Sequence, residues 1–86
     1  MKYPICAIRD AKTTFYPPMI HENEFAAMRS FGMLINNSTG AENYAPGDFD
    51  MYVIGEFDSE KGTIIPEVPI RQIASGFEVY GAKYEK

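Results

Sequence analysis

The sequence predicts an α+β fold, in which one helix packs on a small antiparallel sheet in the order β-β-α-β-β with a C-terminal extension. Two strongly patterned segments lead to this prediction: apolar residues recur at helical spacing within 24–36, and apolar and polar residues alternate along 48–58. A chain of 86 residues has room for one hydrophobic core. We therefore expect a single domain over residues 1–80, followed by a flexible tail at 81–86.

The N-terminal part of the chain predicts two strands joined by a turn. Residues 3–9 are apolar on both faces and rich in strand formers, which is typical of a strand covered on both sides. Residues 10–12 suit a turn, and residues 13–16 predict a short returning strand. This second strand is expected to end at Pro17 and Pro18, because proline has no N–H to donate to a sheet.

The most regular segment predicts a helix over residues 24–36. Asn23 is a suitable N-cap, and the residues from Asn36 to Gly40 favour caps and turns, so the helix is expected to end among them. Gly32 costs about 1 kcal/mol relative to alanine in a helix interior and therefore indicates close backbone packing. The apolar face of the helix comprises Ala27, Met28, Phe31, Leu34 and Ile35.

The alternating segment 48–58 predicts the strongest strand of the sheet. Residues 59–62 predict a turn, in which Gly62 supplies the positive φ that such loops need. Residues 63–65 predict the returning strand, which is expected to stop at Pro66. The helix-facing side of the first strand is expected to comprise Phe49, Met51, Val53 and Phe57.

The opposite side of the strand 48–58 has an apolar centre with acidic residues at both ends, which is the pattern of an interface. The alternative is that the chain's own C-terminal segment covers this centre. In that segment, residues 70–74 predict one helical turn and residues 77–80 a short edge strand. Because a chain this small buries little surface as a monomer, we expect a homo-oligomer, most simply a dimer. The residues expected to form its interface are Tyr52, Ile54, Phe77 and Val79.

The composition favours a cytosolic protein without catalytic chemistry. The net charge is −4, the single cysteine has no internal disulfide partner, and no signal peptide or membrane-spanning stretch is visible. His21 stands beside Glu22 and Glu24 but lacks the second histidine of a metal-binding helix. The carboxylates of 48–58 lack a nucleophile or general acid partner. We therefore expect no catalytic residue, metal or cofactor, and no membrane association.

A few basic and aromatic residues are candidates for nucleic-acid contact. Arg9, Lys12 and Arg29 lie where a strand end, a turn and a helix can bring them together. The chain also contains aromatic rings of the kind that stack on single-stranded bases. The alternative is that these rings belong to the core or to an interface. The aromatic residues concerned are Tyr3, Phe15, Tyr16 and Tyr44.

Taken together, these segments resemble the small nonstructural protein of gokushovirus-type microviruses, which are phages with circular single-stranded DNA genomes. The resemblance covers residues 5–66 and leaves residues 70–86 outside. It rests on four elements in order, each weak alone. They are Ile8-Arg9-Asp10-Ala11-Lys12 followed by Phe15 and Pro18, the helical Ala27-Met28-Arg29-Ser30-Phe31, Pro46-Gly47-Asp48-Phe49, and Gly55-Glu56-Phe57-Asp58 with Gly62.

The resemblance implies a nonstructural phage accessory protein of the host cytoplasm. Members of this family are described as DNA-binding or as acting in single-stranded genome synthesis and packaging. If this chain binds single-stranded DNA weakly, the expected contacts are Arg9, Lys12, Tyr16 and Arg29. The alternative function is a non-enzymatic protein-interaction module that recruits or modulates a replication, packaging or host factor.

Arg29 also has a structural interpretation. It stands beside the apolar helix face, so its stem can pack there while its guanidinium reaches a carboxylate. The expected partner in that case is Asp10 or Asp48. Such an ion pair and a phosphate contact are alternatives that thermal melting of Arg29→Ala distinguishes.

Overall fold

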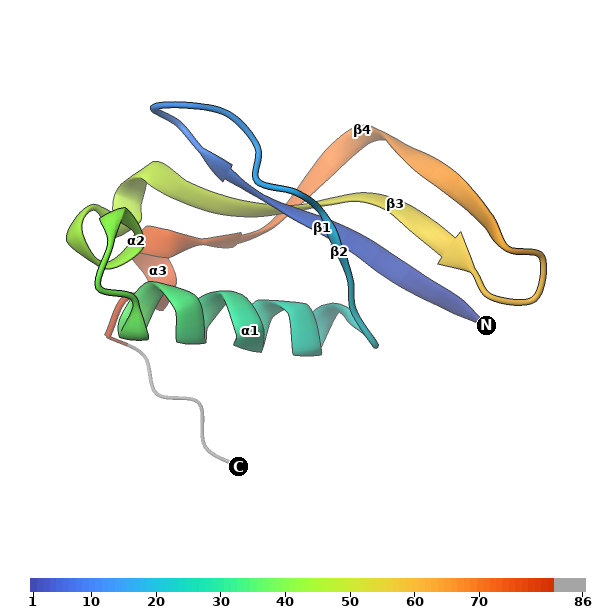
Figure 1. Cartoon of the computed structure of the whole chain (residues 1–86), viewed down its shortest axis with the longest axis horizontal. Coiled ribbons are helices and arrows are strands. Elements are labelled where there is room, and N and C mark those ends of the chain that lie inside the picture. The colour runs from blue at the N-terminus through green and yellow to red at the C-terminus, as the bar shows by residue number, and fades with distance from the viewer. Residues whose placement is uncertain (82–86) are drawn as a thin grey trace.

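The computed structural model describes residues 1–81 and confirms the predicted α+β class. A four-stranded antiparallel sheet has the strand order β2-β1-β3-β4, and the long helix α1 lies along one face of it (Figure 1). Its strands are β1 (Lys2–Asp10), β2 (Met19–Ile20), β3 (Phe49–Asp58) and β4 (Thr63–Ser75). The helical elements are α1 (Glu24–Asn37), α2 (Ala41–Tyr44), the 3-10 turn η1 (Pro46–Asp48) and α3 (Gly76–Val79). Apart from Gly81, the predicted tail 81–86 lies outside the described residues.

Helix α1 begins where the sequence predicts because Asn23 caps it. The Oδ1 atom of Asn23 accepts a hydrogen bond of 2.8 Å from the N–H of Ala26, which satisfies one of the free donors of the first turn. At the other end, the N–H of Ser38 donates to the carbonyl of Leu34 at 3.0 Å, and the helix ends at Asn37. The predicted helix over 24–36 is confirmed.

The hydrophobic core lies between α1 and the sheet. Phe31 and Ile35 of α1 and Phe49 of β3 are the largest fully buried side chains. The predicted contact between the apolar face of α1 and the first half of β3 is therefore confirmed. The core comprises Cys6, Ala27, Phe31, Ile35, Phe49, Met51, Val53 and Ala74.

A β-bulge at Ile54 reverses the faces of the second half of β3. Val53 and Gly55 pair with consecutive residues of β1, so Ile54 is an extra residue in this strand. Because paired residues on neighbouring antiparallel strands share a face, Gly55 and Phe57 lie on the face away from α1. The prediction that Phe57 packs towards α1 is wrong, because regular alternation does not continue through a bulge.

The second strand lies later in the chain than predicted. Residues 13–16 form no strand, and Phe15 makes a single bridge to Arg9. The chain pairs with β1 again after the two prolines, where β2 aligns with Ile5 and Cys6. The reason is that Pro17 and Pro18 cannot donate to a ladder, so pairing resumes beyond them.

Two predictions for the C-terminal part are also wrong. Strand β4 does not stop at Pro66 but continues through residues 70–74, which were expected to form a helical turn. As an edge strand, β4 tolerates prolines, because one row of its backbone groups needs no partner in the sheet. Residues 77–80 were expected to form an edge strand. Instead, residues 77–79 belong to α3, and Tyr80 is the residue that follows this helix.

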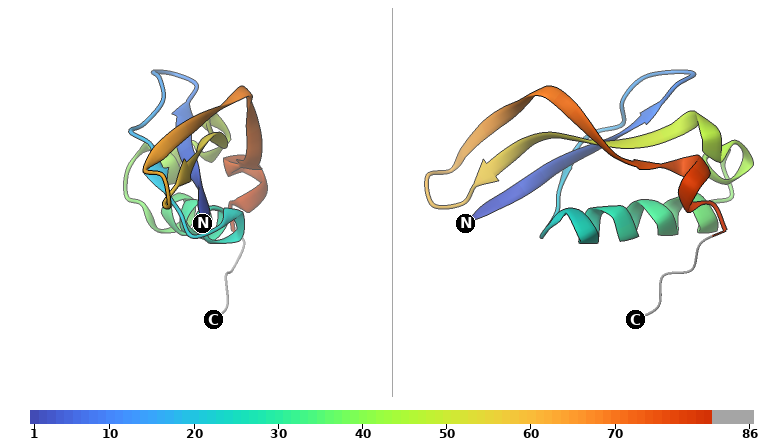
Figure 2. Two further views of the ribbon diagram at one scale, coloured as in Figure 1. Left: turned by 90° about the vertical axis from the view of Figure 1, so that its right-hand side faces the viewer. Right: turned by 180° about the vertical axis from the view of Figure 1, so that it is seen from behind.

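Helices α2 and α3 and the turn η1 close the C-terminal end of α1 (Figure 2). The Nδ2 atom of Asn36 donates to the carbonyl of Val79 at 3.0 Å, and its Oδ1 atom accepts from the N–H of Gly81 at 2.6 Å. The Nδ2 atom of Asn43 donates to the carbonyl of Ile35 at 3.0 Å. These two amide side chains attach α3 and α2 to the last turn of α1.

Three strands continue beyond the start of α1 as an arm that this helix does not cover (Figures 1 and 2). The arm comprises residues 1–5 and 55–66, and its tip is the hairpin between β3 and β4. Gly62 adopts φ +69° in this hairpin, as predicted. The carboxylate of Asp58 accepts from the N–H of Glu60 at 3.0 Å, which explains why an acidic residue is buried there.

Candidate nucleic-acid interface

The sheet face away from α1 carries an exposed aromatic ring beside an arginine. Arg9 and Phe15 form an isolated bridge, so they lie side by side near the end of β1. The ring of Phe15 meets that of Tyr52 edge-on, with the ring centroids 5.8 Å apart and 67° between the planes. Phe15 stays 40% exposed while Tyr52 is half-buried. The chain itself thus covers part of the apolar centre of this face, through Phe15 of the loop 11–18.

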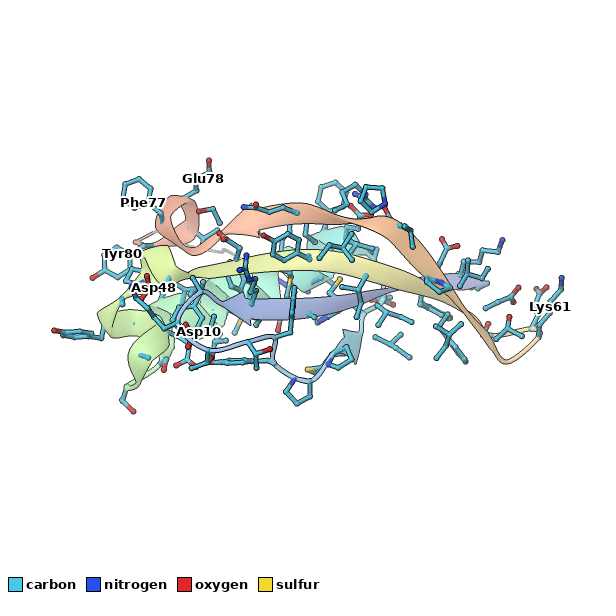
Figure 3. The ribbon with its side chains drawn as sticks, turned by 90° about the horizontal axis from the view of Figure 1, so that it is seen from above. Asp10, Asp48, Lys61, Phe77, Glu78 and Tyr80 are labelled. Carbon is cyan, nitrogen blue, oxygen red and sulfur yellow. The ribbon has the colours of Figure 1, made fainter. Side chains whose placement is uncertain are left out.

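A tight turn holds Lys12 at the same end of the sheet. The N–H of Lys12 donates to the carboxylate of Asp10 at 2.9 Å. Asp10 and Asp48 lie close together at this end in Figure 3, and Asp50 is the β3 partner of Arg9. The two basic side chains therefore stand among three aspartates, which weakens their attraction for a phosphate.

Tyr16 lies on the opposite side of the sheet from Phe15 and is not free to stack on a base. Its ring meets that of Phe49 edge-on at 6.0 Å, and its hydroxyl donates to the carboxylate of Glu42 at 2.7 Å. Burial, together with this hydrogen bond, raises the pKa of Tyr16 to about 12. Hydrogen bonds from Ser38 and Tyr16 lower the pKa of the Glu42 carboxyl. Tyr16 thus joins α2 to the core.

Tyr16→Phe is expected to lower the free energy of unfolding by about 1–2 kcal/mol, because the Glu42 carboxylate loses one of two hydroxyl donors. The wild type is also expected to lose stability as pH rises from about 10 to about 12. Unfolded Tyr16 ionises at the lower value, whereas the folded protein holds the proton to the higher one. Urea unfolding of both proteins at neutral and alkaline pH measures this. If Tyr16→Phe and the wild type lost the same free energy of unfolding between neutral and alkaline pH, Tyr16 would not be the group responsible.

Arg29 lies on the solvent side of α1, away from the sheet face that carries Arg9. It stands two positions before the fully buried Phe31 and is exposed. Asp10 and Asp48 lie at the turn after β1 and in η1, and within residues 1–81 no ion pair joins Arg29 to either of them. The predicted ion pair is wrong. The fold brings Arg9 and Lys12 to one end of the sheet but separates them from Tyr16 and Arg29.

The residues predicted to mediate self-association do not share one surface. Phe77 is 77% exposed on α3, whereas Val79 of the same short helix packs against the core. Tyr52 contacts Phe15, and Ile54 is the half-buried residue of the bulge. Among these four, only Phe77 presents most of its side chain to a partner.

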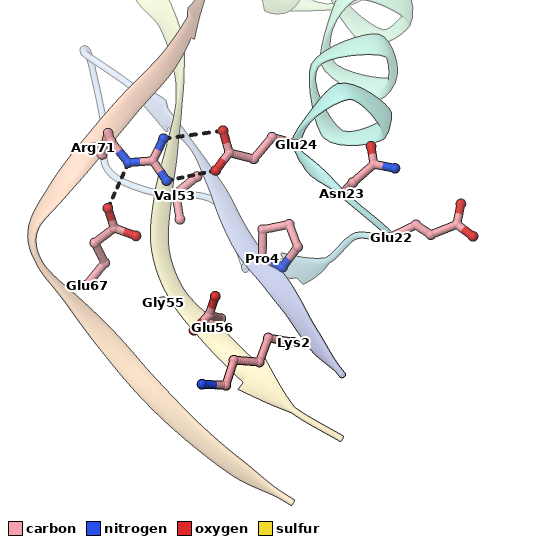
Figure 4. Close-up of a pocket in the computed structure, with 10 residues that line it drawn as sticks. All are labelled: Lys2, Pro4, Glu22, Asn23, Glu24, Val53, Gly55, Glu56, Glu67 and Arg71. Carbon is pink, nitrogen blue, oxygen red and sulfur yellow. Dashed lines mark hydrogen bonds and ion pairs between the residues drawn. The ribbon is translucent and has the colours of Figure 1, made fainter. Parts of the chain in front are cut away.

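A charged cleft of about 240 Å³ lies between the start of α1 and the helix-facing side of the arm (Figure 4). Arg71 of β4 donates to the two carboxylate oxygens of Glu24 at 3.2 and 2.7 Å, and its Nε atom donates to Glu67 at 2.7 Å. These partners raise the pKa of the Arg71 guanidinium, and Arg71 lowers the pKa of the Glu24 carboxyl. The other residues lining the cleft include Lys2, Pro4, Glu22, Asn23 and Glu56.

This cleft does not suit a phosphate, because four glutamates surround its two basic residues. The role of these ion pairs is structural. Arg71 of the edge strand β4 binds Glu24 in the first turn of α1, and Glu67 of β4 holds the Arg71 side chain in position. Sequence reasoning missed it, because Glu24 and Arg71 are far apart in the chain and no local pattern links them.

Comparison with known proteins adds one finding to this geometry. A family model described as Phage ORF5 protein matches residues 3–79. The chain belongs to the Phage ORF5 protein family. The expectation of a phage protein is confirmed, and the match also includes residues 70–79, which the resemblance to gokushovirus proteins leaves outside. No curated protein and no solved structure matches the chain significantly.

Three further features concern residues 1–81 of this ORF5-family protein: potential metal ligands, membrane-spanning helices and the thiol of Cys6. No three His, Cys, Asp or Glu side chains gather there as potential metal ligands, and no helix there is both long and apolar enough to cross a bilayer. Cys6 is buried in the core, and this burial raises its pKa to about 11, so the thiol stays protonated at neutral pH. The exposed ring of Phe15 beside Arg9, in contrast, places an aromatic surface next to a positive charge.

Proposed function

We propose that this phage accessory protein binds single-stranded DNA weakly, during synthesis or packaging of a single-stranded genome. The observation that supports the proposal is the exposed ring of Phe15 beside Arg9 on an open sheet face. We call Arg9, Lys12, Phe15 and Tyr52 the Phe15 platform. The resemblance to nonstructural proteins of single-stranded DNA phages supports this ligand over other polyanions.

The Phe15 platform offers two kinds of contact to a flexible strand. A base can stack on Phe15, whose ring is held in place by Tyr52, and such stacking is worth about 1–3 kcal/mol per base without depending on sequence. Neighbouring phosphates can reach the exposed side chains of Arg9 and Lys12. The net charge of −4 and the adjacent aspartates keep the affinity low.

Arg9→Ala is expected to weaken binding to a fluorescent single-stranded oligonucleotide and to reduce its salt dependence. Two phosphate contacts predict a slope of log affinity against log salt concentration of about −1.4, and one contact predicts about −0.7. Arg29→Ala is the matched control, because it removes the same charge from the far side of the molecule. In this control, the affinity, the slope and the thermal midpoint should stay unchanged. Fluorescence anisotropy over a salt series measures the affinity and the slope, and thermal melting measures the midpoint.

Phe15→Leu tests the stacking contact in the same assay. It should lower the affinity about tenfold and leave the salt slope unchanged, because no charge is removed.

Equal losses of affinity from Arg9→Ala and Arg29→Ala would contradict the Phe15 platform. Absence of binding at low salt would contradict DNA binding altogether. The alternative of a non-enzymatic module that recruits a replication, packaging or host protein would then account better for the acidic surface.

A further inference from the structure

A row of side chains crosses the sheet beside the exposed ring of Phe15, on the face away from α1. Arg9 forms a bridge to Phe15 on one side of β1 and pairs with Asp50 of β3 on the other side. Asp50 follows the fully buried Phe49 along β3, so these two side chains point to opposite faces of the sheet. The ring, the guanidinium and the carboxylate therefore lie next to one another in that order.

The two charged members of this row are not paired with each other. Arg9 and Asp50 have opposite charges and face each other across two strands, yet no ion pair joins them within residues 1–81. The Oδ1 atom of Asp50 accepts a hydrogen bond of 3.3 Å from the Nε2 atom of Gln72. No other hydrogen bond to this carboxylate comes from the part of the chain that the structure describes. Both charges are thus available to a ligand.

The ring of Phe15 leans over β1 towards β3 and so approaches the Asp50 carboxylate. Phe15 and Tyr52 belong to segments on opposite sides of β1, yet their ring centroids are only 5.8 Å apart. Tyr52 and Asp50 share a face of β3 and are separated by about 7 Å along the strand, which is two residues. A purine is larger than the phenyl ring on which it stacks, so its edge can extend from Phe15 to Asp50.

We infer that Asp50 selects guanine as the base that stacks on Phe15, an inference that rests on the single-stranded DNA binding proposed above. Stacking on an aromatic ring tolerates every base, so a preference requires a polar contact to the edge of the base. Asp50 is the acidic side chain of β3 that lies in the same row as the ring and keeps a carboxylate oxygen free of the described hydrogen bonds.

The chemistry of the base edges explains why the preferred base is guanine. Guanine has two neighbouring N–H donors, at N1 and N2, which match the two oxygens of one carboxylate. Adenine and cytosine place a single amino group beside an acceptor nitrogen, and thymine has one N–H between two carbonyl oxygens. A carboxylate is repelled by such acceptor atoms, because both carry negative charge. Asp50 therefore attracts the edge of guanine more strongly than the edges of the other bases.

The neighbouring side chains have separate roles in this arrangement. Arg9 and Lys12 contact phosphates, since a guanidinium that is not paired with Asp50 can turn to the backbone of the strand. Gln72 is a positioning residue, because its amide holds one oxygen of Asp50 through the hydrogen bond described above. If Asp50 contacted no base, its charge would only repel DNA, and its removal would strengthen binding to every sequence alike. This difference makes the inference testable.

Fluorescence anisotropy with oligothymidine strands that differ in one central base tests the inference. The wild type should bind the strand with a central guanine about five- to tenfold more tightly than the strand with a central adenine, at the lower end of the discrimination of a bidentate base contact. Adenine is the matched base because it is a purine of similar stacking area. Hypoxanthine, which lacks the N2 amino group of guanine, should bind like adenine.

Asp50→Asn should bind the guanine and adenine strands with similar affinity. Its affinity for the adenine strand should rise above that of the wild type, because a negative charge is removed. Glu56→Gln is the matched control: Glu56 is an exposed residue of the same strand but lines the cleft on the helix-facing side of the arm. This variant loses the same charge and should keep the preference for guanine. Thermal melting should show both variants folded.

Equal binding of the guanine and adenine strands by the wild type would overturn the inference without the need for any variant. Persistence of the guanine preference in Asp50→Asn, or its equal loss in Glu56→Gln, would also overturn it. In each of these cases, weaker binding of the adenine strand by Phe15→Leu would leave the Phe15 platform intact. If neither strand bound at low salt, the platform and the guanine preference would both be wrong, so the two failures are distinguishable.

Discussion

Phe31→Ala is expected to lower the free energy of unfolding by about 3–5 kcal/mol, the usual cost of removing a buried phenylalanine ring. Phe31 is 1% exposed at the centre of the core, where α1 meets the sheet. Its loss removes buried apolar surface and leaves a cavity that close-packed neighbours fill only in part. Because a domain of this size is stable by only about 5–15 kcal/mol, this loss is a large fraction of its total stability.

Phe25→Ala is the matched control for this prediction, because it makes the same change in the same helix at a position that is 79% exposed. It should change the free energy of unfolding by less than about 0.5 kcal/mol. Urea unfolding followed by circular dichroism at 222 nm measures both variants. Similar losses in the two would mean that α1 does not pack on the sheet through the face described above.

Gly76→Ala is expected to be the most destabilising small substitution, costing about 3 kcal/mol or more. A Cβ atom at Gly76 would collide with the carbonyl oxygen of Pro46 and lie 2.8 Å from that of Phe49. Both obstacles are backbone atoms that belong to η1 and the start of β3, so neither can rotate away. The first residue of α3 must therefore move, and with it the attachment of Val79 to Asn36.

Gly47→Ala is the matched control, since a Cβ atom there would meet nothing within 4 Å. This variant should be as stable as the wild type or slightly more so, because alanine restricts the unfolded chain. Thermal melting of both variants, monitored by circular dichroism, is the measurement. A melting midpoint of Gly76→Ala equal to that of Gly47→Ala would show that α3 does not dock against η1 as described.

The sequence by itself determined the elements whose causes are local. Asn23 caps α1 through a hydrogen bond to a residue three positions away, and the apolar periodicity of α1 selects its buried face. The hairpin of the arm follows from the turn chemistry around Gly62. In each case the decisive interaction joins residues within a few positions of one another, so it can be read from the order of amino acids. The alternating first half of β3 is recognisable for the same reason.

The candidate interface could be predicted only in part. That Arg9 and Lys12 lie at the same end of the sheet follows from their proximity along the chain. The exposed ring, however, is that of Phe15, whereas the neighbouring Tyr16 packs against Phe49. Adjacent residues in an extended segment point to opposite faces, and the sequence does not say which face is open. The bridge of Phe15 to Arg9 and the hydrogen bond of Tyr16 to Glu42 decide that question.

Only the tertiary structure decided the features that depend on long-range pairing. The register between β1 and β3 places a bulge at Ile54 and thereby turns Phe57 to the face of the sheet away from α1. The edge position of β4 lets the strand pass Pro66, and its path brings Arg71 to Glu24. Each outcome is set by the path of the whole chain, because a strand's partners and a charge's neighbours come from segments remote in sequence.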